Sequence, residues 1–347
     1  MTIKSAAGFS AIHHQEKAVH RLTGWLQGGN LPHALLFTGI DGIGKKKTAL
    51  TFAGALNCRM AADRRTAVNS RIVPCGECRP CRKIEAGQHP DVIVITPEKS
   101  RIKILTIRNL GHTLAVKPYE ASQRVVVIDQ AQTMNPEAGN SLLKLLEEPP
   151  ENTVLILIAD NKHNLLPTIV SRCQQVAFKP IPGHAIAEYL EKQGVRGDKA
   201  AILAKLANGS YGKADSLVDA GWVGRREWII QLVDPHDGGG DRSVQIRSFL
   251  AFSELMSLNR EAIPDALEIL ISWFRDLAVV KAGSNRVANT DLMEKIARAA
   301  RHYETASLLA DIDLLEAAKK NIQANVNTRL TLDVMMMNLS PIRSAVR

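Results

Sequence analysis

The sequence predicts an α/β domain built on a parallel sheet, followed by a region made only of helices. The first half holds four short apolar runs, at 34–37, 92–95, 124–128 and 153–158, and the last three are rich in β-branched residues. Continuous runs of this kind are typical of strands that are buried on both faces of a parallel sheet. Helical periodicity separates the runs, and from residue 183 onward it is the only pattern. The alternation therefore predicts an α/β fold for the first half and an all-α fold for the rest.

Local signals place the individual elements in order along the chain. A helix is expected over 15–26, where apolar residues recur on one face, and a second over 48–56, after a glycine-rich turn. A third amphipathic helix is expected over 136–148, and the three glycines within 234–241 predict a loop. These signals divide the chain into an α/β domain at 1–180, a small helical unit at 181–220 and an all-helical domain at 221–347.

The composition excludes several classes of protein. No apolar run reaches the roughly 18 residues of a membrane span, and the N-terminus lacks the apolar stretch of a secretory signal. We therefore expect a cytoplasmic protein with no membrane partner. The net charge of +9 is concentrated in residues 41–124, which hold 16 Lys and Arg against seven Asp and Glu. Such a local excess suggests that phosphate or nucleic acid lies near this region.

The turn after the first apolar run has the pattern of a phosphate-binding loop. Gly39, Gly42 and Gly44 are spaced so that backbone N–H groups can surround phosphate oxygens, and Lys45 can reach the terminal phosphates. Asp129 stands at the end of the third apolar run, where a carboxylate supports magnesium in nucleotide hydrolases. These five residues form the candidate nucleotide site.

Two substitutions make this site degenerate. The loop motif requires Ser or Thr directly after the lysine to hold magnesium, but this position is Lys46, and Thr48 comes two residues too late to replace it. Hydrolysing relatives usually carry glutamate after the strand-end aspartate, whereas this chain has Gln130, which cannot take a proton. We expect no ATP hydrolysis by the chain and poor ATP binding.

Four cysteines have the spacing of metal ligands. Cys75, Cys78 and Cys81 are each three residues apart, and Cys58 lies 17 residues upstream. Four thiolates with no further Cys or His nearby suit a structural, tetrahedral zinc site, although reduced cysteines without metal remain the alternative. Cys173 stands apart and is expected to be a buried small apolar residue.

Several motifs in a fixed order identify a family. They are LPHALLF at 31–37, the degenerate phosphate loop, the four-cysteine insertion, NSLLKLLEEPP at 140–150 and LPTIVSRC at 166–173. Together they resemble the bacterial clamp-loader subunits of the AAA+ class, of the delta-prime type of DNA polymerase III. The resemblance covers residues 8–215. One departure is the interval between Cys58 and Cys75, which is longer than the usual spacing of the family.

The resemblance implies an assembly as well as a fold. Residues 1–180 would be an AAA+ domain with a zinc module at 58–81, residues 181–220 a helical lid, and residues 221–347 a collar for oligomerisation. The partners would be the gamma/tau motor and delta subunits, which together open a sliding clamp and place it on primed DNA within the DNA-directed DNA polymerase holoenzyme. Arg172 matches the arginine finger that acts in trans on ATP held by a neighbouring motor subunit.

Two other interpretations of the sequence are kept. An active gamma/tau-like ATPase would have to tolerate Lys46 and use Gln130 to position water, and it would bind nucleotide tightly with magnesium. A zinc-containing DNA-binding module with a vestigial nucleotide fold would bind primed duplex on its own, with a steep salt dependence.

Overall fold

The structure is a computed structural model and describes residues 8–60, 73–98, 100–219, 221–234, 242–324 and 326–339. The chain divides into two compact units. One contains the residues up to Ile186 together with Asn208–Lys213, and the other contains Ala187–Ala207 and the residues from Ala214. No helix in the described ranges is both long and apolar enough to cross a membrane.

The first unit is built on a five-stranded sheet in which all strands are parallel. Its spatial order is β2-β3-β4-β1-β5. The strands are β1 (Ala34–Thr38), β2 (Val92–Ile95), β3 (Arg124–Ile128), β4 (Thr153–Ala159) and β5 (Gln174–Ala177). The β3 and β4 residues are all buried, which matches the continuous apolar runs from which these strands were predicted. The predicted parallel α/β fold is confirmed.

The fifth strand was not predicted from the sequence. In β5 only Val176 is buried, while Gln174, Gln175 and Ala177 are exposed. A four-residue edge strand with one apolar anchor has neither a continuous apolar run nor a full alternation. Its pairing with β1 is therefore a tertiary property that the local pattern does not reveal.

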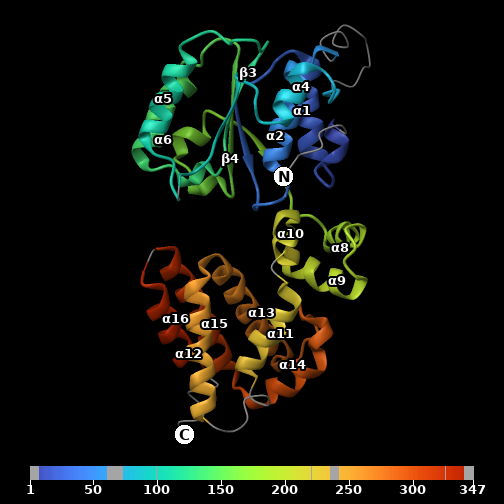
Figure 1. Cartoon of the computed structure of the whole chain (residues 1–347), viewed down its shortest axis with the longest axis vertical. Coiled ribbons are helices and arrows are strands. Elements are labelled where there is room, and N and C mark those ends of the chain that lie inside the picture. Colours follow the sequence, from blue (N-terminus) through green and yellow to red (C-terminus); the bar gives the residue numbers. More distant parts are fainter. Residues whose placement is uncertain are drawn as a thin grey trace. The chain divides into compact units, whose positions relative to one another are not determined.

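Helices cover both faces of the sheet, as Figure 1 shows. On one face lie α5 (Ile104–Leu114) and α6 (Pro136–Glu147), and on the other lie α1 (Glu16–Gly28), α2 (Lys45–Asn57) and α4 (Arg79–Glu85). Leu142 and Leu146 of α6 are buried in one cluster with Leu110 of α5 and the strand residues Ile128 and Leu157. The apolar stripe of the predicted 136–148 helix is thus core packing, and Lys144 is exposed.

All regular secondary structure in the described residues of the second unit is helical, as the sequence predicts. Two helices span the division between the units, α8 (Gly183–Lys192) and α10 (Tyr211–Asp219). The other α-helices are α9 (Gly197–Leu206), α11 (Trp222–Val233), α12 (Arg242–Leu258), α13 (Ile263–Lys281), α14 (Met293–Ala299), α15 (Thr305–Gln323) and α16 (Thr328–Met337). Trp273 and Phe274 of α13 are fully buried, and this helix packs on α11, α14 and α15. The loop predicted at 234–241 falls outside the described residues except for Asp234.

A buried ion pair fixes the loop before β3. Asp91 accepts hydrogen bonds from the backbone N–H groups of Tyr119, Glu120 and Ala121 at 2.8–2.9 Å, and its carboxylate pairs with Arg124 at 3.3 Å. Burial alone would raise the pKa of Asp91, but these hydrogen bonds and the guanidinium hold it below its usual value. The ionised carboxylate therefore ties the start of β2 to the start of β3.

We predict that Asp91→Asn lowers the free energy of unfolding by about 3–5 kcal/mol, because it leaves the buried Arg124 charge uncompensated. The measurement is urea denaturation at pH 7. Because the folded-state pKa of Asp91 lies below its unfolded value, the stabilisation is present above about pH 4 and is lost as the pH falls through the folded pKa.

The matched control is Asp198→Asn, which breaks the exposed pair of Asp198 with Arg196 and should change stability by less than about 1 kcal/mol. Equal losses in the two variants would contradict the structural role of Asp91.

Candidate functional site

The strand order brings the candidate nucleotide residues to one edge of the sheet. The carboxyl ends of β3, β4 and β1 are adjacent, so the loop that starts at Gly39, the Asp129 carboxylate and Asp160 follow neighbouring strands. The N–H of Gly39 donates to the carbonyl of Asp160 at 3.1 Å. Ligand sites of open parallel sheets form at this edge.

A second segment lies directly on the phosphate loop. Gly42 has φ +76°, and a Cβ at this position would stand 2.2 Å from the hydroxyl of Ser210 and 3.0 Å from the backbone of Gly212. The N–H of Gly212 donates to the carbonyl of Gly42 at 3.1 Å. Glycine is therefore required at position 42 for the approach of residues 208–213 as well as for its left-handed conformation.

The first loop lysine points into its own loop. The side chain of Lys45 is buried, and its ammonium donates to the carbonyls of Gly39 and Ile40 and contacts the carboxylate of Asp41 at 3.3 Å. Burial lowers the pKa of Lys45, although Asp41 partly offsets that effect. In this arrangement its donors are used by the loop itself.

The second loop lysine occupies the place of a metal ligand. The ammonium of Lys46 lies 3.2 Å from a carboxylate oxygen of Asp129, whose side chain is 18% exposed. Thr48 is fully buried and donates to the carbonyl of Gly44, so its hydroxyl cannot take over the missing Ser or Thr. A divalent cation would have to displace a tethered cation from Asp129. The residues present therefore do not fit a magnesium–nucleotide complex.

Gln130 cannot replace the glutamate that ATP-hydrolysing relatives carry at this position. It is exposed, with φ +52°, and its N–H donates to the side chain of Asp129 at 3.1 Å. An amide side chain cannot accept a proton from an attacking water at neutral pH. Lys46 and Gln130, the two substituted positions, thus both contact the carboxylate of Asp129.

Arg172 lies away from this loop. It follows the short α7 (Pro167–Val170), and its guanidinium donates to the carbonyl of Thr168 at 3.1 Å and pairs with Glu147 at 2.7 Å. Within the described residues, no hydrogen bond or ion pair joins Arg172 to the phosphate loop. Its side chain is 38% exposed, so it could reach a group outside the chain.

The four predicted cysteines come together in space. Cys58 follows α2, Cys78 caps α4, and the four sulfur atoms lie within 4.8 Å of one another. The sulfur atoms of Cys75 and Cys81 are 4.0 Å apart, and those of Cys78 and Cys58 are 3.9 Å apart. A tetrahedron with Zn–S bonds of about 2.3 Å requires sulfur–sulfur distances of about 3.8 Å, whereas a disulfide requires about 2.05 Å. The group therefore fits a metal ion.

The surroundings shift two thiols of the cluster in opposite directions: backbone groups favour the thiolate of Cys75, whereas burial raises the pKa of Cys81. Burial opposes ionisation of Cys75, but N–H groups of Cys78 and Glu77 outweigh it and lower the pKa of Cys75 to about 7. The N–H of Cys75 in turn donates to the sulfur of Cys58 at 3.4 Å. Cys173 is buried elsewhere, and burial raises its pKa to about 12, which matches the small apolar role expected of it.

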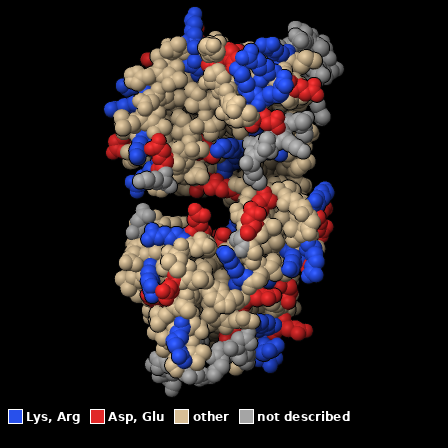
Figure 2. All heavy atoms as spheres, in the orientation of Figure 1, with Lys and Arg blue, Asp and Glu red and all other residues tan. Residues whose placement is uncertain are grey.

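Basic side chains gather around the cysteine cluster. Figure 2 shows Lys and Arg concentrated over the part of the α/β unit where Figure 1 places α4. This helix carries Arg79, Arg82 and Lys83 beside Cys81 of the cluster. Most of the charge excess of residues 41–124 thus belongs to the segments of the phosphate loop and the cysteine cluster.

Two contacts of the site were not predicted from the sequence. Glu147 stands in the quoted LEEPP motif, but its partner Arg172 is 25 residues away, and no spacing rule links them. The packing of Ser210 and Gly212 on Gly42 joins segments about 170 residues apart. Only the glycine pair around Ser210 gave a local signal, as a break between helices.

Comparison with known proteins decides the family. A family profile described as "DNA polymerase III, delta subunit" matches residues 14–182, and its C-terminal counterpart matches residues 243–340. DNA polymerase III subunit delta' of Pseudomonas aeruginosa is 30% identical over 315 residues, which cover 88% of this chain and 90% of the relative. The chain belongs to the delta-prime family of DNA polymerase III subunits.

A second delta' subunit agrees with this assignment, whereas a tau/gamma subunit matches a smaller share of the chain. Subunit delta' of Bacillus subtilis is 28% identical over 329 residues, covering 94% of this chain and 96% of the relative. The tau/gamma subunit of Haemophilus influenzae is 35% identical over 217 residues, which cover 61% of this chain but only 30% of that protein. The delta-prime family resemblance inferred from the sequence motifs is therefore confirmed.

We predict that Lys46→Thr creates magnesium-dependent nucleotide binding, because it removes the ammonium from Asp129 and supplies a hydroxyl ligand. Titration with a fluorescent ATP analogue should show affinity at least about tenfold higher with magnesium than without it, a difference of ~1.4 kcal/mol.

Lys47→Thr is the matched control, since the ammonium of Lys47 donates to the carbonyl of Ala11 instead. If Lys46→Thr gains no more magnesium-dependent affinity than Lys47→Thr, the ion pair is not what excludes the metal.

Proposed function

We propose that the chain is a non-catalytic subunit of the bacterial DNA polymerase III clamp loader, an AAA+ assembly, and that it helps to load the sliding clamp onto primed DNA. It holds no working ATP site of its own and supplies Arg172 to ATP bound by a neighbouring motor subunit. The observation that carries this proposal is the ion pair of Lys46 with Asp129, together with an exposed Arg172 that pairs with Glu147.

The role of Arg172 follows from charge. Transfer of a γ-phosphoryl group spreads negative charge over its oxygens, and a guanidinium from a second chain stabilises it. A chain whose own site excludes magnesium can still perform this function, because the finger and the nucleotide belong to different subunits. The gamma/tau motor and the delta subunit are the partners we propose, and the name of the tau/gamma relative supports the first of them.

A polar groove between α5 and α6 supports contact with primed DNA in the assembly. Its volume is about 580 Å³, and its lining includes the cations Arg108 and Lys144, the carboxylate of Glu137, and the polar His112, Asn140 and Ser141. Cations and amide donors are the groups that contact a phosphate backbone without reading sequence. A single groove supplies few such contacts, so binding by the isolated chain should be weak.

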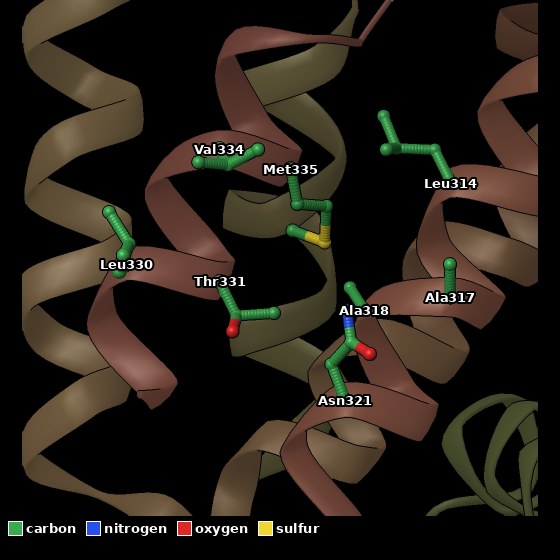
Figure 3. A pocket seen from close by; sticks show the side chains of 8 residues that line it. All are labelled: Leu314, Ala317, Ala318, Asn321, Leu330, Thr331, Val334 and Met335. Atoms are coloured by element: carbon green, nitrogen blue, oxygen red, sulfur yellow. The ribbon is translucent and has the colours of Figure 1, made fainter. Parts of the chain in front are cut away.

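The helical unit has a surface suited to a collar of sister subunits. A groove of about 240 Å³ lies between α15 and α16. Met335 and Leu314 stand at its sides (Figure 3). Leu330 is 60% exposed and Val334 is 51% exposed beside it. Apolar surface of this kind is typical of subunit interfaces. It supports the expected oligomerisation domain at residues 221–347, with residues 181–220 as the lid.

The cysteine cluster is proposed to hold one structural zinc ion. Cys58, Cys75, Cys78 and Cys81 would bind it as thiolates, leaving no open position for catalysis. The ion would join the end of α2 to α4 and fix the inserted module on the α/β unit. Four thiolates and one Zn²⁺ would add two negative charges and reduce the local basic excess.

We predict that the purified chain contains one zinc ion, measured by atomic emission spectroscopy. Cys81→Ala should abolish the zinc and lower the melting temperature, because binding of the metal is coupled to folding of the module. Cys173→Ala is the matched control, since Cys173 is also buried but lies outside the cluster, and it should keep the full zinc content. Loss of zinc in both variants, or in neither, would contradict the assignment.

We predict that Arg172→Ala lowers DNA-stimulated ATP hydrolysis of a reconstituted clamp loader by about tenfold or more at the site that it serves. The isolated wild-type chain should show no hydrolysis above background. Normal turnover by the loader that contains Arg172→Ala would contradict the finger assignment.

The two alternative functions have less support. An active gamma/tau-like motor would need Asp129 for magnesium, but this carboxylate pairs with Lys46. A zinc-containing DNA-binding module is favoured by the basic side chains around α4. Strong, salt-dependent binding of primed duplex by the isolated chain would support it over the subunit role.

A further inference from the structure

We propose that Glu147 is a positioning residue for the arginine finger: its carboxylate holds the guanidinium of Arg172 in the direction from which it can reach a neighbour's nucleotide. The inference rests on the proposed role of Arg172 in trans. It is carried by the ion pair between Arg172 Nη2 and Glu147 Oε1 at 2.7 Å.

The guanidinium is held from two different elements. Arg172 Nη1 donates to the carbonyl of Thr168 at 3.1 Å, one turn back along the chain, while Nη2 is held by Glu147 at the last position of α6. A long arginine side chain anchored at one point can still rotate, but two anchors on separate elements define the plane of its guanidinium. Glu147 is therefore the contact that selects the direction of the finger.

Both anchors stand on packed structure. Ile169 of α7 is buried, and Gly139 of α6 lies so close to Leu166 that an added Cβ would be 2.9 Å from its side chain. Directly after Glu147 the chain continues as Glu148-Pro149-Pro150, and proline restricts the backbone on both sides of this junction. The carboxylate is thus presented from a fixed helix end, and Arg172 from a fixed turn.

The pair is suited to hold the finger without sequestering it. Arg172 is 38% exposed and Glu147 is 50% exposed, so water screens their attraction. A guanidinium has five N–H donors, and the two contacts use only part of them. The remaining donors can face a phosphate while the pair persists. At the C-terminal end of α6 the helix dipole disfavours a carboxylate, and the charge of Arg172 offsets this effect.

The test is steady-state ATP hydrolysis by a clamp loader reconstituted with the full-length chain and its motor and delta subunits, with primed DNA and clamp. Glu147→Ala should lower kcat by about three- to tenfold and leave the KM for ATP unchanged, because misorientation of the finger affects the transition state more than binding. Glu147→Gln keeps an acceptor oxygen and should lose less. Glu148→Ala, the adjacent exposed glutamate, is the matched control and should match wild type.

A double-mutant cycle separates positioning from a general structural effect. Glu147→Ala combined with Arg172→Ala should be no slower than Arg172→Ala alone, because Glu147 acts only through the arginine. Additive losses, a kcat that rises in Glu147→Ala, or a Glu148→Ala effect of equal size would overturn the inference while leaving the finger assignment intact. If Arg172→Ala itself turns over normally, the finger and its positioning residue are both refuted.

Discussion

The ammonium of Lys46 stands 3.2 Å from the carboxylate of Asp129, at the edge of the sheet where a magnesium ion would be needed. This ion pair satisfies the carboxylate that the parallel sheet delivers there. The neighbouring Lys45 is equally occupied, because its ammonium is bound by carbonyls of its own loop. The phosphate loop thus keeps its backbone form while its cations are bound internally, and this constraint determines which roles remain open to the chain.

The proposed arginine-finger role uses a different part of the α/β unit. Arg172 is presented by α7, pairs with Glu147 of α6 and makes no described interaction with the phosphate loop. The proposed role of Arg172 as a finger therefore does not depend on a magnesium site in its own chain. The cysteine cluster is a third feature, since Cys58 follows α2 and Cys81 lies in α4. A family member that assists a neighbour's chemistry is the assignment most consistent with these three features.

The sequence was sufficient where a short pattern has a single physical meaning. Buried runs such as 124–128 predicted four of the five strands, and the spacing of the cysteines predicted a cluster that the structure brings together. The edge strand Gln174–Ala177 was missed because a single buried residue makes no pattern. The sequence showed that position 46 carries a cation, but it did not predict that the ammonium of Lys46 pairs with Asp129. The pair of Glu147 with Arg172 depends on how α6 packs on α7, which only the fold determines.

The central claim is that the wild-type chain holds no magnesium–nucleotide site of its own. The most direct measurement is equilibrium titration of the purified chain with a fluorescent ATP analogue across a range of magnesium concentrations. We predict weak binding whose affinity does not rise with magnesium, because Asp129 is already neutralised by Lys46. Saturable binding that strengthens with magnesium and leads to turnover would contradict the account and identify the chain as a motor.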